Sequence, residues 1–374
     1  MSTPRAVDDL EAILSQVNTD DDAVVHAVPA AFDAMFTWDY AKGERPALDK
    51  LYEKAKTSQW NGSTDLDWSI DVDPERTAVE LSQNDARMRY VRKLIDEPGS
   101  PVANWGEQEI VHYAMENLCH RASQFLHGEQ GALLCTARIV ETVPWIDAKY
   151  YASTQVMDEA RHVEVFARYL DEKMTTHYPM NAHLGALIDD VLSDSRWDIT
   201  YLGMQIMIEG LALAAFGAMY KTTSEPLLRQ LIRYVMGDEA RHVAFGVLSL
   251  QEAYADLSGP ELRERQEFVF EASLRMRDRF LHQEVWERLG VSARAIVPYF
   301  IRQHNEEELL FQRMLFAKIV PNCKKLGLLD GRDRWLRNKF TEMGVIEYED
   351  HVDTSIEYSE LNAIERDREA ARTG

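Results

Sequence analysis

The sequence predicts an all-α protein with a four-helix bundle at its centre and extra helices flanking it. Three observations lead to this prediction. Long segments with the apolar periodicity of helices are separated by breaks that contain proline or glycine. No segment has a convincing strand or hairpin pattern. The hexapeptide Asp-Glu-Ala-Arg-His-Val occurs twice, at 158–163 and 238–243, and each copy follows a lone glutamate in an apolar helical run.

The composition limits the classes of function. The chain has 374 residues, of which 45% are hydrophobic and 28% charged, so a large core is available. A formal net charge of −22 without a basic cluster argues against nucleic acid as a partner. Three scattered cysteines (Cys119, Cys135 and Cys323) are too few for a disulfide framework or a Cys-rich metal site. The first residues lack the apolar segment of a secretory signal, so we expect a cytoplasmic protein.

Residues 1–105 are predicted to form an N-terminal helical extension and connector. Residues 1–60 have a loose helical pattern. The segment 60–74 is rich in turn residues, and we expect Trp60 and Trp68 to anchor it by packing while its aspartates cap helices. A short helix is predicted at 82–96.

Residues 106–256 are predicted to form the bundle, and its first two helices follow one another closely. The first runs from 106 to 143, where Pro144 stops it, and it carries Glu129. The second begins at 145–147, continues to 173, and carries Glu159 and His162.

The other two helices of the bundle repeat this arrangement. The third is predicted at 183–220, with an irregularity near 193–195, and carries Glu209. The fourth begins at Ser224-Glu-Pro226, where a capping serine precedes a proline in the first turn. It carries Glu239 and His242 and ends before residue 258.

Residues 257–374 are predicted to pack on the bundle as helices at 261–289, 292–315 and 334–343, followed by a polar tail. The segment 199–220 is also long and apolar enough to cross a bilayer. However, Gln205 and Glu209 lie near its middle, and a glutamate inside a membrane is costly without a partner. We therefore expect a helix of the bundle core and no membrane association.

The repeated residues have the spacing of metal ligands. Positions i and i+3 share a face of a helix, so Glu159 and His162 can bind one ion together, and so can Glu239 and His242. The lone Glu129 and Glu209 each precede these pairs by thirty residues. A glutamate from each of two helices with a Glu-x-x-His pair from each of two others is a known two-metal site. Mixed oxygen and nitrogen ligands favour iron or manganese over copper(I) or structural zinc.

The neighbours of the ligands add a second set of candidates. A metal-bound histidine usually donates its other N–H to a carboxylate. Asp158 and Asp238 are placed to accept it, each from the histidine of the opposite repeat, and Arg161 and Arg241 can neutralise these aspartates. Small residues next to the lone glutamates would allow close helix approach or leave room for a ligand; these are Gly128, Gly131 and Gly210.

A bare Glu-x-x-His pair is a weak signal, because Glu109 and His112 also match it. They precede Glu129 by about 30 Å along a helix and cannot share its site. We interpret them, with Glu116, His120 and His127, as ordinary polar residues. The alternative for the repeated hexapeptide is a metal-free helix surface with salt bridges. Its apolar neighbours argue against this alternative; they are Val156, Met157, Val163, Val235, Met236 and Val243.

Residues 106–256 resemble the ferritin-like superfamily of non-haem di-iron carboxylate proteins, in particular its dioxygen-activating oxygenases and oxidases. The resemblance implies a ferritin-like four-helix bundle that holds two iron ions, with a manganese–iron pair as the other option. It implies as ligands Glu129, Glu159, His162, Glu209, Glu239 and His242.

Three positions depart from particular branches of this superfamily. Phe166 stands where the small subunits of ribonucleotide reductase carry a radical tyrosine, and Tyr169 is one turn too far along. Val235 stands where aryl-amine N-oxygenases carry an additional histidine. Leu213 replaces the threonine that is usual in multicomponent hydrocarbon hydroxylases. The chain also lacks the Cys-rich domain of rubrerythrins.

The function expected from the resemblance is oxidation of a small organic substrate by dioxygen, by hydroxylation or N-oxygenation. The alternatives are a radical protein like the ribonucleotide reductase small subunit, and a ferroxidase or iron-handling protein. A scaffold with a structural metal fits less well, because such sites rarely use six ligands. We expect a substrate pocket beside the lone glutamates, with candidate lining residues Phe125, Ala132, Gln205, Leu213 and Phe216.

No acid or base outside the ligands can be assigned from the sequence. A nucleotide-binding fingerprint is also absent, so we expect electrons from an external donor such as a ferredoxin or a flavoprotein reductase; direct entry of peroxide is the alternative. A homodimer formed through the long helices is compatible with this interpretation.

Overall fold

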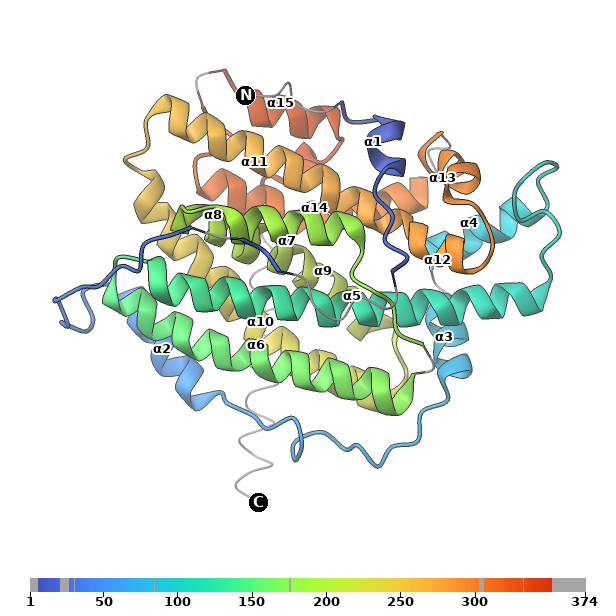
Figure 1. The fold of residues 1–374 in the computed structure, drawn as a ribbon, viewed down its shortest axis with the longest axis horizontal. Helices are drawn as coiled ribbons and strands as arrows, with labels where there is room; N and C mark the ends of the chain where they lie inside the picture. The colour runs from blue at the N-terminus through green and yellow to red at the C-terminus, as the bar shows by residue number, and fades with distance from the viewer. Residues whose placement is uncertain are drawn as a thin grey trace.

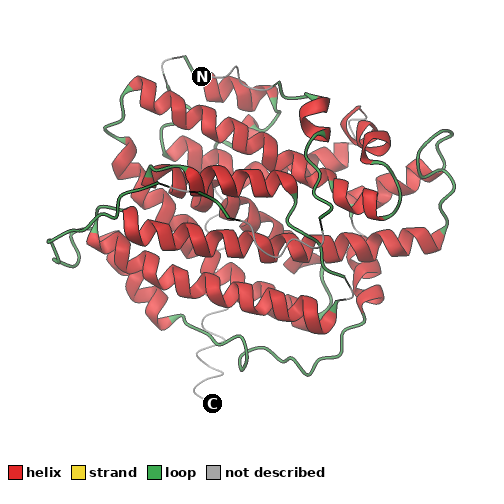
Figure 2. Cartoon of the chain, in the orientation of Figure 1, coloured by secondary structure: helices red, strands yellow, loops and turns green. Residues whose placement is uncertain are grey.

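The protein is built from helices throughout the part of the chain that the structure describes (Figures 1 and 2). This computed structural model describes residues 6–20, 27–29, 31–83, 85–174, 176–302, 306–331 and 333–351, apart from the side chains of 302 and 306–315. No strand occurs in these ranges. The prediction of an all-α fold is confirmed.

Four long helical segments form the central bundle. Helices α5 (Glu107–Thr142) and α6 (Ile146–Lys173) lie side by side and have the most extensive contact in the molecule (Figure 1). Helix α10 (Pro226–Tyr254) packs against α6. It also packs against a continuous segment made of α8 (Trp197–Tyr201), the π-helix η1 (Leu202–Ile208) and α9 (Glu209–Thr222).

The third predicted helix is wrong in its extent. Helix α7 (Ala182–Ser193) ends where an irregularity was expected, and the bundle helix begins only at Trp197. The Asp194 side chain accepts a hydrogen bond from the backbone N–H of Arg196 at 2.8 Å. Such a local bond between a side chain and the backbone competes with helix formation, which explains the break.

The fourth helix begins where predicted, but with a different cap. The carboxylate of Glu225 accepts hydrogen bonds from the backbone N–H groups of Leu227 at 2.7 Å and Leu228 at 2.6 Å. Ser224 instead donates its hydroxyl to Glu80. Pro226 occupies the first turn, as expected.

The segment predicted as one helix at 261–289 contains a sharp turn. Helix α11 (Gly259–Asp278) is followed by the 3-10 turn η2 (Arg279–Leu281) and by α12 (Gln283–Arg288). His282 joins them in the left-handed conformation, with φ at 52°. The buried indole of Trp286 donates to the Leu281 carbonyl at 3.1 Å and stabilises this turn.

The N-terminal extension is less helical than the prediction. Among the described residues up to 60, only α1 (Leu10–Leu14) and α2 (Pro46–Thr57) are helical. The chain before α2 is held on the bundle by Asp147, which accepts from the backbone N–H groups of Gly43 and Arg45. The helix predicted at 82–96 is α4 (Ala86–Ile95), and a helix that was not predicted, α3 (Pro74–Ser82), precedes it; each is capped by an aspartate.

The remaining helices cover one side and one end of the bundle. They are α13 (Ala293–Arg302), α14 (Glu306–Lys325), α15 (Trp335–Glu342) and the 3-10 turn η3 (Ile346–Tyr348). In Figure 1, α11, α14 and α15 lie along the same side. The predicted tail beyond 351 lies outside the described residues, and the division at 105/106 and 256/257 remains a prediction.

One helical segment, Trp197–Thr222, is long and apolar enough to span a membrane by length and composition alone. Its apolar window is 72% buried inside the protein, as expected for the core helix of a bundle.

Candidate metal centre

The six predicted ligands converge from all four helical segments of the bundle. Glu129, Glu159, His162 and Glu239 form one group, and Glu159, Glu209 and His242 form a second. In each group, the candidate ligand atoms lie within 4.8 Å of one another, and every residue is buried. Because Glu159 belongs to both groups, the two positions share a carboxylate.

The local structure of the third segment places Glu209. The π-helix η1 ends immediately before it, and Glu209 is the first residue of α9. A π-turn contains one more residue per hydrogen-bonded ring than an α-turn, so it changes which face the following residues occupy. On α10, Gly246 leaves room for this segment: a Cβ at Gly246 would lie 2.5 Å from Cβ of Gln205.

Both histidines direct Nδ1 into the cluster. Nδ1 of His162 lies 3.1 Å from Oε2 of Glu129 and 3.2 Å from Oε1 of Glu239. Nδ1 of His242 lies 3.1 Å from Oε1 of Glu159 and 3.5 Å from Oε1 of Glu239. Nδ1 of each histidine is therefore the atom available to a metal ion.

The donor atoms fit a pair of bound cations. Several buried atoms of the cluster have no hydrogen-bond partner among the described residues; they are Oε2 of Glu159 and Glu209, both carboxylate oxygens of Glu239, and Nδ1 of His242. Buried polar atoms without a partner are costly, and divalent cations would satisfy them. The ligand atoms are oxygens and imidazole nitrogens with no thiolate, which suits iron or manganese.

The electrostatics of the cluster without metal point the same way. Burial, with the nearby Glu239 carboxylate, raises the pKa of Glu129 to about 8. Burial and the same neighbour raise the pKa of Glu209 well above its usual range. Burial opposes the charging of His162 and His242, but the adjacent carboxylates outweigh it and raise both pKa values. In the absence of cations, the buried carboxylates can thus be balanced by protons.

Behind the histidines, Asp158 and Asp238 lie in the crossed arrangement. Nε2 of His162 is 3.1 Å from Oδ2 of Asp238, and Nε2 of His242 is 3.4 Å from Oδ2 of Asp158. Arg161 and Arg241 each donate to both aspartates, so two carboxylates and two guanidinium groups form a closed, buried network. This network connects α6 to α10 and orients the imidazoles.

The connector before the bundle contributes to this network, which the sequence did not indicate. The indole Nε1 of Trp60 donates to Oδ2 of Asp238 at 2.7 Å, and the Gln59 amide donates to Oδ1 of Asp158 at 2.9 Å. Trp60 also stacks on Tyr234 and lies over the guanidinium of Arg161. The sequence suggested only a packing role for Trp60, because its partners are remote along the chain.

Gln155 is a further residue of the site that sequence reasoning missed. Its buried Nε2 donates at 2.9 Å both to Oε1 of Glu159 and to Oε1 of Glu209. It precedes Glu159 by four residues on α6, so a search of the i−4 position of the predicted ligand could have found it.

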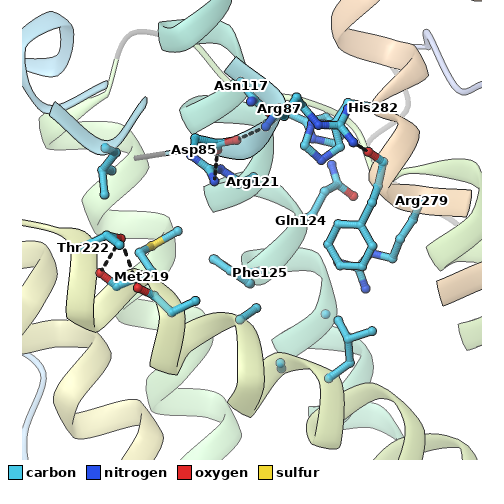
Figure 3. Close-up of a pocket in the computed structure, with 18 of the residues that line it drawn as sticks. Asp85, Arg87, Asn117, Arg121, Gln124, Phe125, Met219, Thr222, Arg279 and His282 are labelled. Carbon is cyan, nitrogen blue, oxygen red and sulfur yellow. Dashed lines mark hydrogen bonds and ion pairs between the residues drawn. The ribbon is translucent and has the colours of Figure 1, made fainter. Parts of the chain in front are cut away.

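A cavity of about 430 Å³ leads to three of the cluster's carboxylates, those of Glu129, Glu209 and Glu239. Its walls come mainly from α5 and α9 and are largely apolar; they include Leu81, Phe125, Ala132, Ile208, Leu211, Ala212, Ala215 and Met219. Figure 3 shows Phe125 in the middle of the cavity, between Met219 on one side and Arg279 on the other.

The prediction of the cavity lining was partly wrong. Phe125 and Ala132 line it, whereas Gln205, Leu213 and Phe216 do not. Gln205 faces the backbone of Gly246, and Phe216 stacks against Phe166 with ring centroids 5.8 Å apart. Gln205 and Phe216 are therefore turned toward neighbouring helices.

The other residues named in the sequence analysis lie outside the ligand cluster. His120, expected to be an ordinary polar residue, is buried and lines the end of the cavity away from the ligands. Glu109 caps the start of α5, and His112 lies 3.5 Å from Glu116. Tyr169 donates its hydroxyl to Glu225 at 3.0 Å.

The three glycines next to the lone glutamates have different surroundings. Gly128 lines the cavity. A Cβ at Gly131 would lie 2.6 Å from Ile188 on α7, so this glycine allows close helix approach. At Gly210 the nearest atom would be Ile319 at 3.8 Å.

Comparison with known proteins gives only distant matches. No family model matches the sequence, and neither does any curated protein. Among solved structures, the chain is similar to an R2-like ligand-binding oxidase with an aerobically reconstituted metal cofactor after photoconversion. The two sequences are 15% identical, the TM-score is 0.48, and the match covers 76% of this chain and 94% of that chain. The chain is similar to an R2-like ligand-binding oxidase with an aerobically reconstituted Mn/Fe cofactor, with 16% identity, a TM-score of 0.47 and coverage of 76% and 93%.

Proposed function

We propose that this protein is a dioxygen-activating di-metal oxidoreductase of the ferritin-like type that oxidises a small organic substrate. Its ligands would be Glu129, Glu159, His162, Glu209, Glu239 and His242, and its ions two irons or a manganese–iron pair. The proposed chemistry is hydroxylation or N-oxygenation.

One observation supports an organic substrate above all others. The cavity of about 430 Å³ reaches the carboxylates of Glu129, Glu209 and Glu239 through mostly apolar walls. This volume lies within the range of about 300–1,000 Å³ typical of small-molecule pockets. A site that only oxidised or stored iron would need a path for hydrated cations, which apolar walls do not favour.

The bound ions would supply the reduction of dioxygen, and the chain would supply control of the site. The apolar side chains around Phe125 exclude water from the side where a substrate would lie. Asp158 and Asp238 hold the proton on Nε2 of the histidines, which leaves Nδ1 free to bind metal. Gln155 fixes the orientation of two ligand carboxylates.

Two partners complete this proposal. Insertion of one oxygen atom with reduction of the other to water requires two electrons per turnover. The chain has no nucleotide-binding fingerprint, so we propose a ferredoxin or a flavoprotein reductase as the external donor. We also retain a homodimer as the proposed assembly.

The radical-protein alternative has less support from the structure than an oxygenase. Phe166, at the position of the radical tyrosine, is fully buried and packs with Phe125 and Phe216. Tyr169 donates its hydroxyl to Glu225. An electron paramagnetic resonance signal of a tyrosyl radical after exposure of the reduced protein to dioxygen would favour this alternative.

The proposed site can be tested by metal analysis and oxygen uptake. Protein expressed with iron should contain about two metal ions per chain, as the six-ligand arrangement implies, and its reduced form should consume dioxygen. Glu209→Ala should lose most of the metal bound at the second position and most of this consumption. Glu172→Ala, an exposed glutamate on α6, is the matched control and should retain both. Unchanged metal content in Glu209→Ala would contradict the proposal.

A further inference from the structure

The end of the cavity opposite the metal ligands is rich in cationic side chains. Arg87, Arg89, Arg121 and Arg279 line the cavity together with a single carboxylate outside the ligand cluster, that of Asp85. Figure 3 labels Asp85, Arg87, Arg121 and Arg279. Asp85 is already engaged: Oδ1 accepts from the backbone N–H groups of Arg87 and Met88, and Oδ2 lies 3.5 Å from Arg121. Several cationic side chains are therefore gathered at this end of the cavity.

Arg279 is the least compensated of these groups. Among the described residues, no carboxylate or carbonyl accepts a hydrogen bond from its side chain, and its nearest aromatic contact is its own neighbour, Phe280. Burial alone lowers the pKa of the Arg279 guanidinium to about 10. A guanidinium at a cavity wall without an acceptor can donate several hydrogen bonds to a ligand that supplies one.

Two further polar groups face the same end without a partner in the described part of the chain. The Nδ1 atom of His282, a residue only 6% exposed, has no hydrogen-bond partner, and neither has Oδ1 of the buried Asn117. His282 adopts the left-handed conformation that begins the turn into α12, so this turn carries His282 and Arg279 into the cavity wall. The cations of Arg87 and Arg121 surround them.

We propose that the cavity binds an organic carboxylate, with its carboxylate group at Arg279 and its apolar body extending along α5 and α9 toward Glu129 and Glu209. The planar guanidinium matches a carboxylate with two parallel hydrogen bonds. The apolar stretch around Phe125 and Ala215 accommodates a hydrocarbon portion. The part of the ligand farthest from its carboxylate would then lie closest to the metal centre.

This proposal rests on the proposed function for the reaction, but the binding itself can be tested separately. The probes are octanoate, octan-1-ol and octylamine, which share an apolar chain and differ in charge. Calorimetry with the protein as purified, and again after chelation, gives an affinity that does not depend on turnover. We expect octanoate to bind at least about tenfold more tightly than octan-1-ol, because a hydrogen bond to a charged group is stronger than one between neutral groups. Octylamine should bind least.

Arg279→Gln should weaken octanoate binding by about 10- to 100-fold and leave octan-1-ol binding unchanged, since it removes a charged hydrogen-bond partner. Arg279→Lys keeps the positive charge but loses the planar guanidinium group. This variant should retain the preference for octanoate over octan-1-ol. Arg294→Gln, at an exposed arginine with a surface partner, is the control and should match the parent protein.

Equal affinities for octanoate and octan-1-ol, or octanoate binding that Arg279→Gln leaves intact, would overturn the proposal. Octanoate binding that requires the metal but not Arg279 would likewise overturn it, because the carboxylate would then bind at the ions. If octyl phosphate bound more tightly than octanoate, the preferred ligand would be a phosphate ester, and this result would also contradict the proposal. Charge-selective, Arg279-dependent binding in protein that holds no iron would support this inference while refuting the proposed function.

Discussion

Replacement of Asp238 by asparagine should strongly destabilise the protein. Asp238 is 1% exposed, and its carboxylate accepts from Trp60 at 2.7 Å, from His162 and Arg161 at 3.1 Å, and from Arg241. An asparagine amide at this position would offer one oxygen and would turn an NH₂ group toward donors. The buried network would then hold two guanidinium groups against the single charge of Asp158.

The magnitude follows from the loss of one partner in a buried ion network, which costs about 3–5 kcal/mol. The remaining contacts of Arg161 and Arg241 with Asp158 keep the loss from being larger. We therefore expect the free energy of unfolding to fall by about 3–5 kcal/mol. Metal affinity should fall by about 10- to 100-fold as well, because His162 loses the acceptor that orients it.

Urea unfolding of the metal-free protein measures the first effect, because bound metal would add its own binding energy to the stability. Asp190→Asn is the matched control: Asp190 pairs with Arg275 at the surface, its side chain is 53% exposed, and such pairs contribute about 0–1 kcal/mol. If Asp238→Asn costs no more than Asp190→Asn, the buried network does not stabilise the fold as reasoned here.

Three other predictions concern the packing and electrostatics of the same centre. Gln155→Leu should lower metal affinity by about 10-fold or more, because Glu159 and Glu209 lose a shared hydrogen-bond donor. Equilibrium competition with a chelator measures the affinity, and an unchanged affinity would refute this prediction. Gly246→Ala should destabilise the protein by about 1–3 kcal/mol, because its Cβ would lie 2.5 Å from Cβ of Gln205. Thermal unfolding tests this second prediction, with Gly237→Ala on the same helix, where a Cβ would meet nothing within 4 Å, as the control. The metal-free protein should lose stability as pH rises from 4.5 to about 8, since Glu129 holds its proton more tightly folded than unfolded and this contribution is complete only below 4.5. The raised pKa values of Glu209, His162 and His242 act in the same direction, whereas the lowered pKa values of the buried His120, His127 and His282 act against it. Added metal should remove the loss that comes from the cluster, because cations replace the protons on its ligands. A pH dependence of stability that is the same with and without metal would contradict the assignment.

The amino-acid sequence by itself determined the class of the fold and the residues that meet at its centre. Helical periodicity places Glu159 and His162 on one face of their helix, and Glu239 and His242 on another, whatever the surroundings. The repeat of the hexapeptide and of its upstream glutamates then indicated which helices must face one another. Pro144 and Pro226 marked helix boundaries because proline is disfavoured in a helix interior and favoured in a first turn.

Only the tertiary structure decided how the helices are rotated and what surrounds the cluster. Trp60 meets Asp238, and Arg279 meets the cavity that begins at Glu129, through contacts between segments remote in sequence. A helical pattern specifies positions around its own axis, but not which neighbouring helix each face meets. That choice depends on close approaches such as Gly246 against Gln205, on the π-turn before Glu209, and on the turn at His282. Each of these depends on the packing of whole side chains across helices, which no local sequence pattern encodes.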